Sequence, residues 1–266
     1  MVMSGDEVMV VIVSAVVAAM VWYRWYSAVL VRSLVMRNTS RPLFVAAPVV
    51  CLALLYAILL RWAADDVRHS GTYMTFYMVA GAAWVGLSAK FCCFLGVSPR
   101  DDAVERQNLA AAFAAAGALV GITFCFAGGN VGNGPGWWVV VFSAGLASGA
   151  FFALWALVEW LTGVSESVTV ERADGAGLRL GGFLAGTGLI LGRSVAGDWV
   201  SAEATVRDFV TVAWPVLPLA VAAILAERVL PFDPRARSAD ALGGLFISGL
   251  FVAASSLYVF VWQGMP

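Results

Sequence analysis

Eight long apolar stretches, separated by short polar segments, dominate the pattern of this chain. Each stretch has roughly 20 residues, which is the length that an α-helix needs to cross the hydrocarbon core of a bilayer. The sequence therefore predicts an all-α fold, a polytopic membrane helix bundle with about eight transmembrane helices in a single domain. The expected spans are residues 8–31, 42–60, 73–95, 109–127, 137–161, 176–196, 209–229 and 241–261.

An asparagine or aspartate recurs at a constant interval near the start of the even-numbered spans. Asn108, Asp174 and Asp240 are each separated by 66 residues. A side-chain oxygen at such a position accepts hydrogen bonds from the free N–H groups of the first helical turn. We therefore predict that these three residues are helix caps in a tandem repeat.

Small residues follow the predicted caps at helical spacing. Gly117 and Gly121 in one span, and Gly182 and Gly186 in the next even-numbered span, are four residues apart, which lets a neighbouring helix backbone approach closely inside a membrane. Because one repeat contains two spans, successive units enter the membrane in the same direction. The prediction is four parallel hairpins of about 66 residues, with units at residues 8–70, 73–136, 137–200 and 207–266.

One charged residue recurs in each odd-numbered span, at intervals of 66, 69 and 68 residues. These candidates are Arg24, Lys90, Glu159 and Glu227. Charges inside a membrane need partners or access to water. Two alternatives follow: the four charges neutralise one another in a closed network, or each side chain extends to the membrane surface.

The 16 basic residues are divided unevenly among the polar segments. Cytoplasmic loops of membrane proteins carry an excess of Arg and Lys. The larger group is therefore predicted to be cytoplasmic, which puts both termini outside the cell. It consists of Arg24, Arg32, Arg37, Arg41, Lys90, Arg100, Arg106, Arg172, Arg179, Arg228, Arg235 and Arg237, and the smaller group of Arg61, Arg68, Arg193 and Arg207.

Composition supports the membrane assignment. The 266 residues are 61% hydrophobic and 12% charged, whereas a soluble domain carries about 25% charged residues. The lipid bilayer is thus the expected partner. The net charge of −1 argues against a nucleic-acid partner, because that binding depends on neutralising phosphates with Lys and Arg.

Residues for catalysis, metal binding or cofactor attachment are scarce. His69 is the only histidine and falls in a predicted loop, so neither paired haem ligands nor a Ser/His/Asp set can be assembled in the membrane. The four cysteines lie in apolar runs and form no CxxC pair. We therefore predict no catalytic residue, no metal, no cofactor and no enzymatic activity.

The runs RQNLAAAFAAAGALVG and RADGAGLRLGGFLAGTGLILG resemble the repeated signature of the domain of unknown function 350 family. The resemblance covers about residues 73–199, and Asn108, Gly117 and Gly121 match the pattern. It implies a small bacterial inner-membrane protein built from similar two-helix hairpins. It implies no reaction, because the family is uncharacterised.

Two functions follow from these features. The first is a non-enzymatic membrane module that assembles with itself, as a homo-oligomer, or with other membrane proteins. Small-residue seams, short loops and the scarcity of catalytic groups favour it. The alternative is a transporter or channel for an ion or small polar solute. The repeats, the charges within the spans and the glycine-rich connection at residues 127–136 favour that alternative.

Overall fold

A computed structural model describes residues 3–33, 41–230 and 236–263, and within these ranges the chain is all-helical apart from isolated bridges at Ala63. Arg37 and Arg235, two of the basic residues used to predict orientation, lie outside the described residues. The long helices are α1 (Gly5–Ser33), α2 (Arg41–Trp62), α4 (Gly71–Ser88), α5 (Leu109–Gly128), α6 (Trp137–Thr162), α8 (Asp174–Ser194), α9 (Ala202–Ala213), α10 (Val216–Val229) and α11 (Arg237–Leu257). Short helical segments are α3 (Asp65–Arg68), η1 (Phe91–Leu95), η2 (Pro99–Glu105), α7 (Val164–Thr169) and η4 (Tyr258–Trp262).

Seven helical segments of the described chain are long and apolar enough to cross a membrane. An eighth is added when α9 and α10 are counted as one span bent by 45°. Each of the eight predicted apolar stretches coincides with one of these segments. The prediction of a helical chain with seven to eight apolar spans is therefore confirmed.

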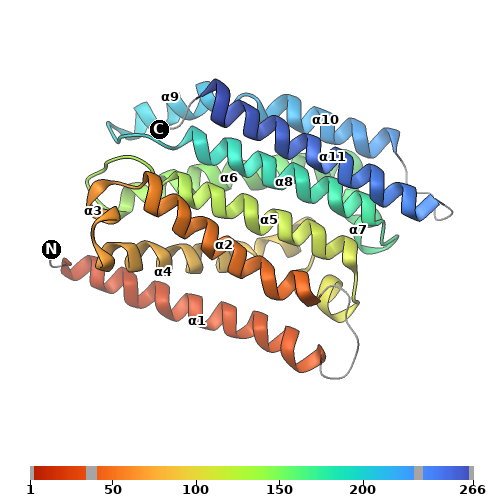
Figure 1. Cartoon of the computed structure of the whole chain (residues 1–266), viewed down its shortest axis with the longest axis horizontal. Helices are drawn as coiled ribbons and strands as arrows, with labels where there is room; N and C mark the ends of the chain where they lie inside the picture. Colours follow the sequence, from red (N-terminus) through yellow and green to blue (C-terminus); the bar gives the residue numbers. More distant parts are fainter. Residues whose placement is uncertain (1–2, 34–40, 231–235, 264–266) are drawn as a thin grey trace.

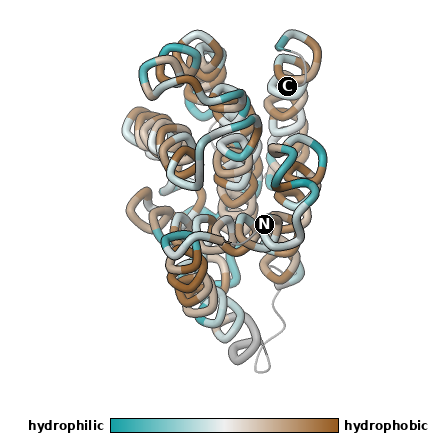
Figure 2. Tube along the Cα trace, turned by 90° about the vertical axis from the view of Figure 1, so that its left-hand side faces the viewer, coloured by the Kyte–Doolittle hydropathy of each residue, from teal (hydrophilic) through white to brown (hydrophobic). Residues whose placement is uncertain are grey.

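The long helices form two rows. Figure 1 shows α2, α5, α8 and α11 side by side and running in the same direction, while α1, α4, α6 and α10 run the opposite way. Both chain termini lie at the same end of the bundle (Figure 1). Figure 2 views the molecule from that end, where hydrophilic segments lie on the connections and hydrophobic helices extend behind them.

The seam between α5 and α8 is built from backbone contacts. Gly117 lies against Gly181, and a side chain at Gly117 would collide with the backbone there. Gly121 lies against the Leu184 carbonyl and the Phe151 ring. The contacts join residues 63 or 64 positions apart, so α5 and α8 are parallel.

The seam between α8 and α11 uses a second face of α8. Gly182 packs against Ser248, and Gly186 packs against Ser255 and the Phe251 backbone. These pairs are 65 to 69 residues apart, so α8 and α11 are also parallel. Helix α8 is therefore held by close contacts on two sides.

Side-chain hydrogen bonds connect the helices of the second row, which consists of α1, α4, α6 and α10. The Trp22 indole in α1 donates to the Ala82 carbonyl in α4 at 2.9 Å, and the Trp84 indole donates to Ser148 Oγ in α6 at 3.1 Å. Arg228 at the end of α10 donates to the Leu161 carbonyl of α6 at 2.8 Å. Each helix of this row is thus tied to its neighbour.

One predicted span is interrupted. The sequence predicts a continuous helix over residues 209–229, but α9 ends at Ala213 and α10 begins at Val216. Pro215 occupies the N-cap of α10 and has no N–H to donate to the preceding turn. The hydrogen-bond ladder of α9 therefore stops, and the two helices meet at 45°.

The α-helix in the predicted span 73–95 ends early. Helix α4 stops at Ser88, and the 3₁₀ turn η1 continues the chain to Gly96. Gly96 has φ of 79°, in the left-handed region that favours glycine, so the chain turns there. The predicted intramembrane residue Lys90 consequently lies outside α4, at the N-cap of η1.

A matched pair of glycine substitutions tests the backbone seam. Gly117→Ala should destabilise the protein by about 1–3 kcal/mol, because the new methyl group has no room against Gly181. Gly149→Ala in α6 should be neutral or slightly stabilising, since nothing lies within 4 Å of that position. Thermal unfolding of the purified protein in detergent, followed by circular dichroism, measures both. Equal stability of the two variants would contradict the seam.

Candidate functional site: a buried arginine between two carboxylates

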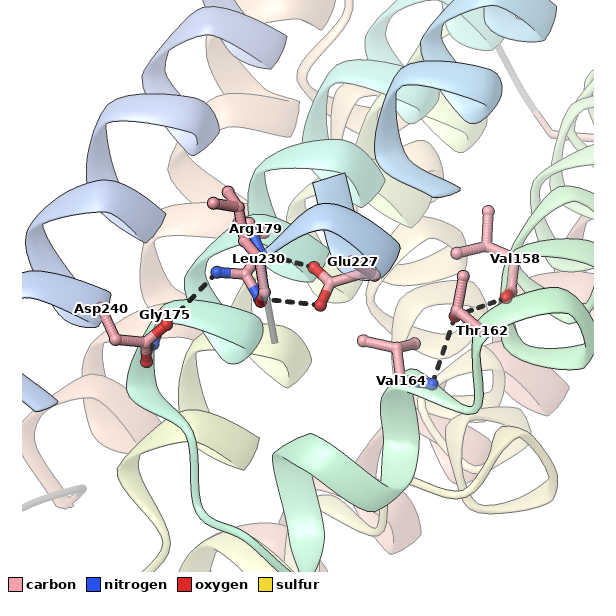
Figure 3. A network of polar contacts seen from close by, with 8 residues as sticks. All are labelled: Val158, Thr162, Val164, Gly175, Arg179, Glu227, Leu230 and Asp240. Atoms are coloured by element: carbon pink, nitrogen blue, oxygen red, sulfur yellow. Dashed lines mark hydrogen bonds and ion pairs between the residues drawn. The ribbon is translucent and has the colours of Figure 1, made fainter. Parts of the chain in front are cut away.

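Arg179, Glu227 and Asp240 form a charge cluster (Figure 3), and the helix ends that carry them lie at the end of the bundle away from the termini (Figure 1). Arg179 donates from Nε to Glu227 Oε1 at 2.7 Å and from Nη2 to Glu227 Oε2 at 2.8 Å. Its Nη1 lies 3.4 Å from Asp240 Oδ1. The exposed fractions of the three side chains are 3%, 9% and 9%, so the charge cluster is almost completely removed from solvent.

Three helices supply the charge cluster. Arg179 projects from the second turn of α8, Glu227 from the last turn of α10, and Asp240 from the first turn of α11. Asp240 Oδ2 also accepts a hydrogen bond from the Gly175 N–H at 2.9 Å. Asp240 therefore caps α8, the neighbouring helix, and Gly175 leaves room for that carboxylate.

The charges explain why these groups stay together. Moving a single ion out of water costs several kcal/mol, and only a well-placed partner offsets that cost. The Arg179 guanidinium faces two carboxylates, so the cluster has a formal charge of −1. The N-terminus of α8, next to Asp240, contributes partial positive charge from its free N–H groups. Without Arg179, the partial positive charge of the α8 N-terminus would be the only nearby charge left to offset the two buried carboxylates.

Little space remains beside the charge cluster. The adjoining void has a volume of about 10 Å³ and is lined mainly by apolar side chains such as Val158 and Phe183. That is close to the minimum volume for one water molecule. The nearby turn from α6 to α7 is closed by Thr162, which accepts from Val164 N–H at 3.2 Å (Figure 3). The arrangement suits a structural latch better than a substrate site.

The predicted cap at Asn108 forms, and it also reaches the next hairpin. Asn108 is the N-cap of α5, and its Oδ1 accepts from the Ala111 N–H at 3.3 Å. Its Nδ2 donates to the Val168 carbonyl in α7, the short helix that precedes α8, at 2.7 Å. Asn108 is buried. The Asn108 side chain therefore caps the N-terminus of α5 and also holds the segment that leads into α8.

The predictions for Asp174 and Asp240 need correction. The N-cap of α8 is Ala173, which has no side-chain cap, and the N-cap of α11 is Ala236. The residue before the cap has φ of 54° at Gln107 and 55° at Arg172. The structural interval is therefore 65 residues, and the predicted interval of 66 places Asp174 one position inside the helix.

Asp174 acts between helices instead. Its Oδ2 lies 3.7 Å from Nε of Arg237, and Arg237 Nη2 donates to the Arg172 carbonyl at 3.1 Å. These contacts join the start of α8 to the start of α11. Asn108, Asp174 and Asp240 thus share one feature, a contact with the neighbouring hairpin.

The predicted network of Arg24, Lys90, Glu159 and Glu227 does not form among the described residues. Arg24 and Lys90 are exposed and line one cavity of about 380 Å³, which Arg100 and Asp101 also line. Glu159 accepts from the Ser165 hydroxyl at 2.6 Å and closes the turn before α7. Only Glu227 is paired, and its partner is Arg179.

Sequence reasoning missed Arg179 as a partner and used it only for orientation. The available signal was a basic residue within an apolar span and an acidic residue at the corresponding end of a neighbouring span.

No family model, curated protein or solved structure matches this chain. The resemblance to the domain of unknown function 350 family therefore stays a prediction.

Replacing the buried arginine tests the latch. Arg179→Met should lower the free energy of unfolding by about 3–5 kcal/mol, because two carboxylates stay buried without their counter-charge. Adding Glu227→Leu should recover part of the loss. Arg237→Met is the control, since its partly exposed pair with Asp174 is worth at most about 1 kcal/mol. Unfolding in detergent measures all three, and equal losses for the two single arginine variants would contradict the latch.

Proposed function

We propose that this chain is a multi-pass protein of the bacterial inner membrane, built from four tandem hairpins and acting as a non-enzymatic assembly module. The parallel helices α2, α5, α8 and α11 support the tandem arrangement. So do contacts between equivalent places in successive units, such as Asn133 with Asp198 and Gly175 with Asp240. Each of these pairs is 65 residues apart.

An apolar groove between α10 and α11 is the observation that carries the assembly role. Its volume is about 750 Å³, and it opens sideways from the bundle. Both helices pack on α8, and the groove between them exposes Leu225, Leu250 and Ala254. An apolar groove of this kind accepts an apolar helix.

A second copy of the chain is the occupant we propose. Helix α11 exposes large apolar side chains over its length, including Leu242, Phe246 and Leu250. In a two-fold pair, the same surface of each copy meets that of the other. Helix α11 of one copy would then occupy the groove of its partner.

Transport is the second candidate, and one observation favours it. A polar cavity of about 280 Å³ lies at the end of the bundle that carries the termini. Between this cavity and the charge cluster, however, the α5–α8 seam fills the interior with contacts such as Gly121 on Gly188. A solute path would require these two backbones to separate. Assembly needs no such rearrangement, so it is the conclusion we favour.

Reporter fusions test the proposed orientation. Alkaline phosphatase, which is active only outside the inner membrane, should be active when fused after Asn133 or at the C-terminus. It should be inactive after Arg100, in the basic group of loops. A cytoplasmic fluorescent reporter at the same points should give the reverse pattern. Phosphatase activity after Arg100 would contradict the proposed topology.

Tryptophan substitutions test assembly through the groove. Ala254→Trp fills the groove and should largely abolish co-purification of two differently tagged copies from mild detergent. Ala253→Trp, on the neighbouring exposed position of α11 outside the groove, should leave co-purification intact. Light scattering should give the matching masses. A wild-type chain that is monomeric in membranes and detergent, or equal effects of both variants, would refute the proposal.

A further inference from the structure

The polar cavity at the terminal end of the bundle is a formed feature of the fold. Its wall combines the starts of α1, α4 and α6, the short helix α3, and the connection after α5. That connection is fixed against the one after α8, because Gly197 N–H donates to the Val131 carbonyl at 3.0 Å and Trp199 N–H donates to the Asn133 carbonyl at 2.8 Å.

One buried polar atom in the cavity wall, Asn130 Oδ1, has no hydrogen-bond partner among the described residues. Asn130 is 5% exposed, and its Nδ2 donates to the Phe126 carbonyl at 2.8 Å while its Oδ1 accepts from no described residue. Ser143, which is 3% exposed, supplies a hydroxyl group to the same cavity wall. Unpaired buried polar groups are rare and costly. An unpaired acceptor in the same wall as a hydroxyl group indicates a ligand that donates hydrogen bonds.

The charge of the cavity wall is negative. Glu7 and Asp66 line the cavity, and neither has an ion-pair partner among the described residues. Glu7 accepts from the Tyr73 hydroxyl at 3.2 Å, which holds its carboxylate in the wall. No described Lys, Arg or His lines the cavity. The nearby Arg68 lines a neighbouring recess and pairs with Asp65. The site therefore favours a cation.

Aromatic side chains refine the ligand class. Tyr73, Tyr77 and Trp199 line the cavity, and aromatic faces attract cations. The Trp199 ring is positioned by an edge contact with Trp138, with ring centroids 5.1 Å apart. A volume of about 280 Å³ accommodates an organic molecule as well as its charged group.

We propose that this cavity binds a small primary ammonium compound. The ammonium group would donate to Asn130 Oδ1 and Ser143 Oγ and be neutralised by Glu7 and Asp66. A quaternary ammonium carries the same charge but has no N–H to donate, so it fits the unpaired acceptor less well. This inference goes beyond the assembly role and does not depend on it.

Calorimetric titration of the purified full-length protein in detergent tests the site. The probe is n-propylammonium, compared with tetramethylammonium, n-propanol and sodium at equal ionic strength. Propylammonium should bind saturably, tetramethylammonium should bind about tenfold more weakly, and propanol should not bind. Quenching or enhancement of tryptophan fluorescence at Trp199 provides a second readout.

Substitutions locate the binding. Glu7→Gln, Asp66→Asn and Ser143→Ala should each weaken propylammonium binding, with about tenfold loss for the carboxylate changes. Asp65→Asn is the matched control, because Asp65 neighbours Asp66 but lies outside the cavity. Asn130→Leu should also weaken propylammonium binding. If this variant does not fold, Glu7→Gln, Asp66→Asn and Ser143→Ala still test whether the cavity is the binding site.

Three outcomes would overturn the proposal. The first is no saturable binding of propylammonium to the wild-type protein. The second is unchanged affinity in both Glu7→Gln and Ser143→Ala. The third is tighter, competitive binding of sodium, which would assign the cavity to an inorganic cation. Loss of co-purification in the groove variant Ala254→Trp, with normal propylammonium binding, would separate this site from the assembly role.

Discussion

Direct contact between the backbones of α5 and α8 is the constraint on which the architecture depends. Gly117 meets Gly181 near the middle of the seam, and Gly128 meets Gly192 near its end. In the membrane location that we propose for this chain, helices gain little from leaving lipid for protein, so close packing and hydrogen bonds hold them together. Glycine permits the closest packing, and the remaining helices take their positions from this pair. Phe151 of α6, which is fully buried, closes the seam on one side.

The last hairpin is held by a different interaction. Glu227 anchors the end of α10 to Arg179 of α8, and Asp240 anchors the start of α11 to the same guanidinium. Both helices therefore converge on α8 at one end of the bundle. At the other end of the bundle, the Tyr258 hydroxyl donates to the Val212 carbonyl of α9 at 2.7 Å. The lateral groove lies between α10 and α11, along the length between these two points of attachment.

Properties that depend on position along one helix were predictable from the sequence. Apolar length located the eight spans, and spacing by four residues identified Gly117 and Gly182 as close-packing positions. Partners between helices were not predictable, because pairing of Arg179 with Glu227 depends on how α8 and α10 rotate about their axes. The polar cavity was hidden for a similar reason. Asn130 and Glu7 lie far apart in the chain and meet only through the fold.

The nearly constant interval across the hairpin contacts has a consequence for how the chain matures. The principal bonds and seams between hairpins join residues about 65 positions apart, as in Asn133 with Asp198. In the tandem arrangement that we propose, a hairpin leaving the ribosome can therefore dock on the preceding hairpin without waiting for distant sequence. Such assembly follows the order of synthesis and keeps loop-closure entropy low. A nascent chain that ends after α8 would already contain the α5–α8 seam, while the second glycine face of α8 would await α11.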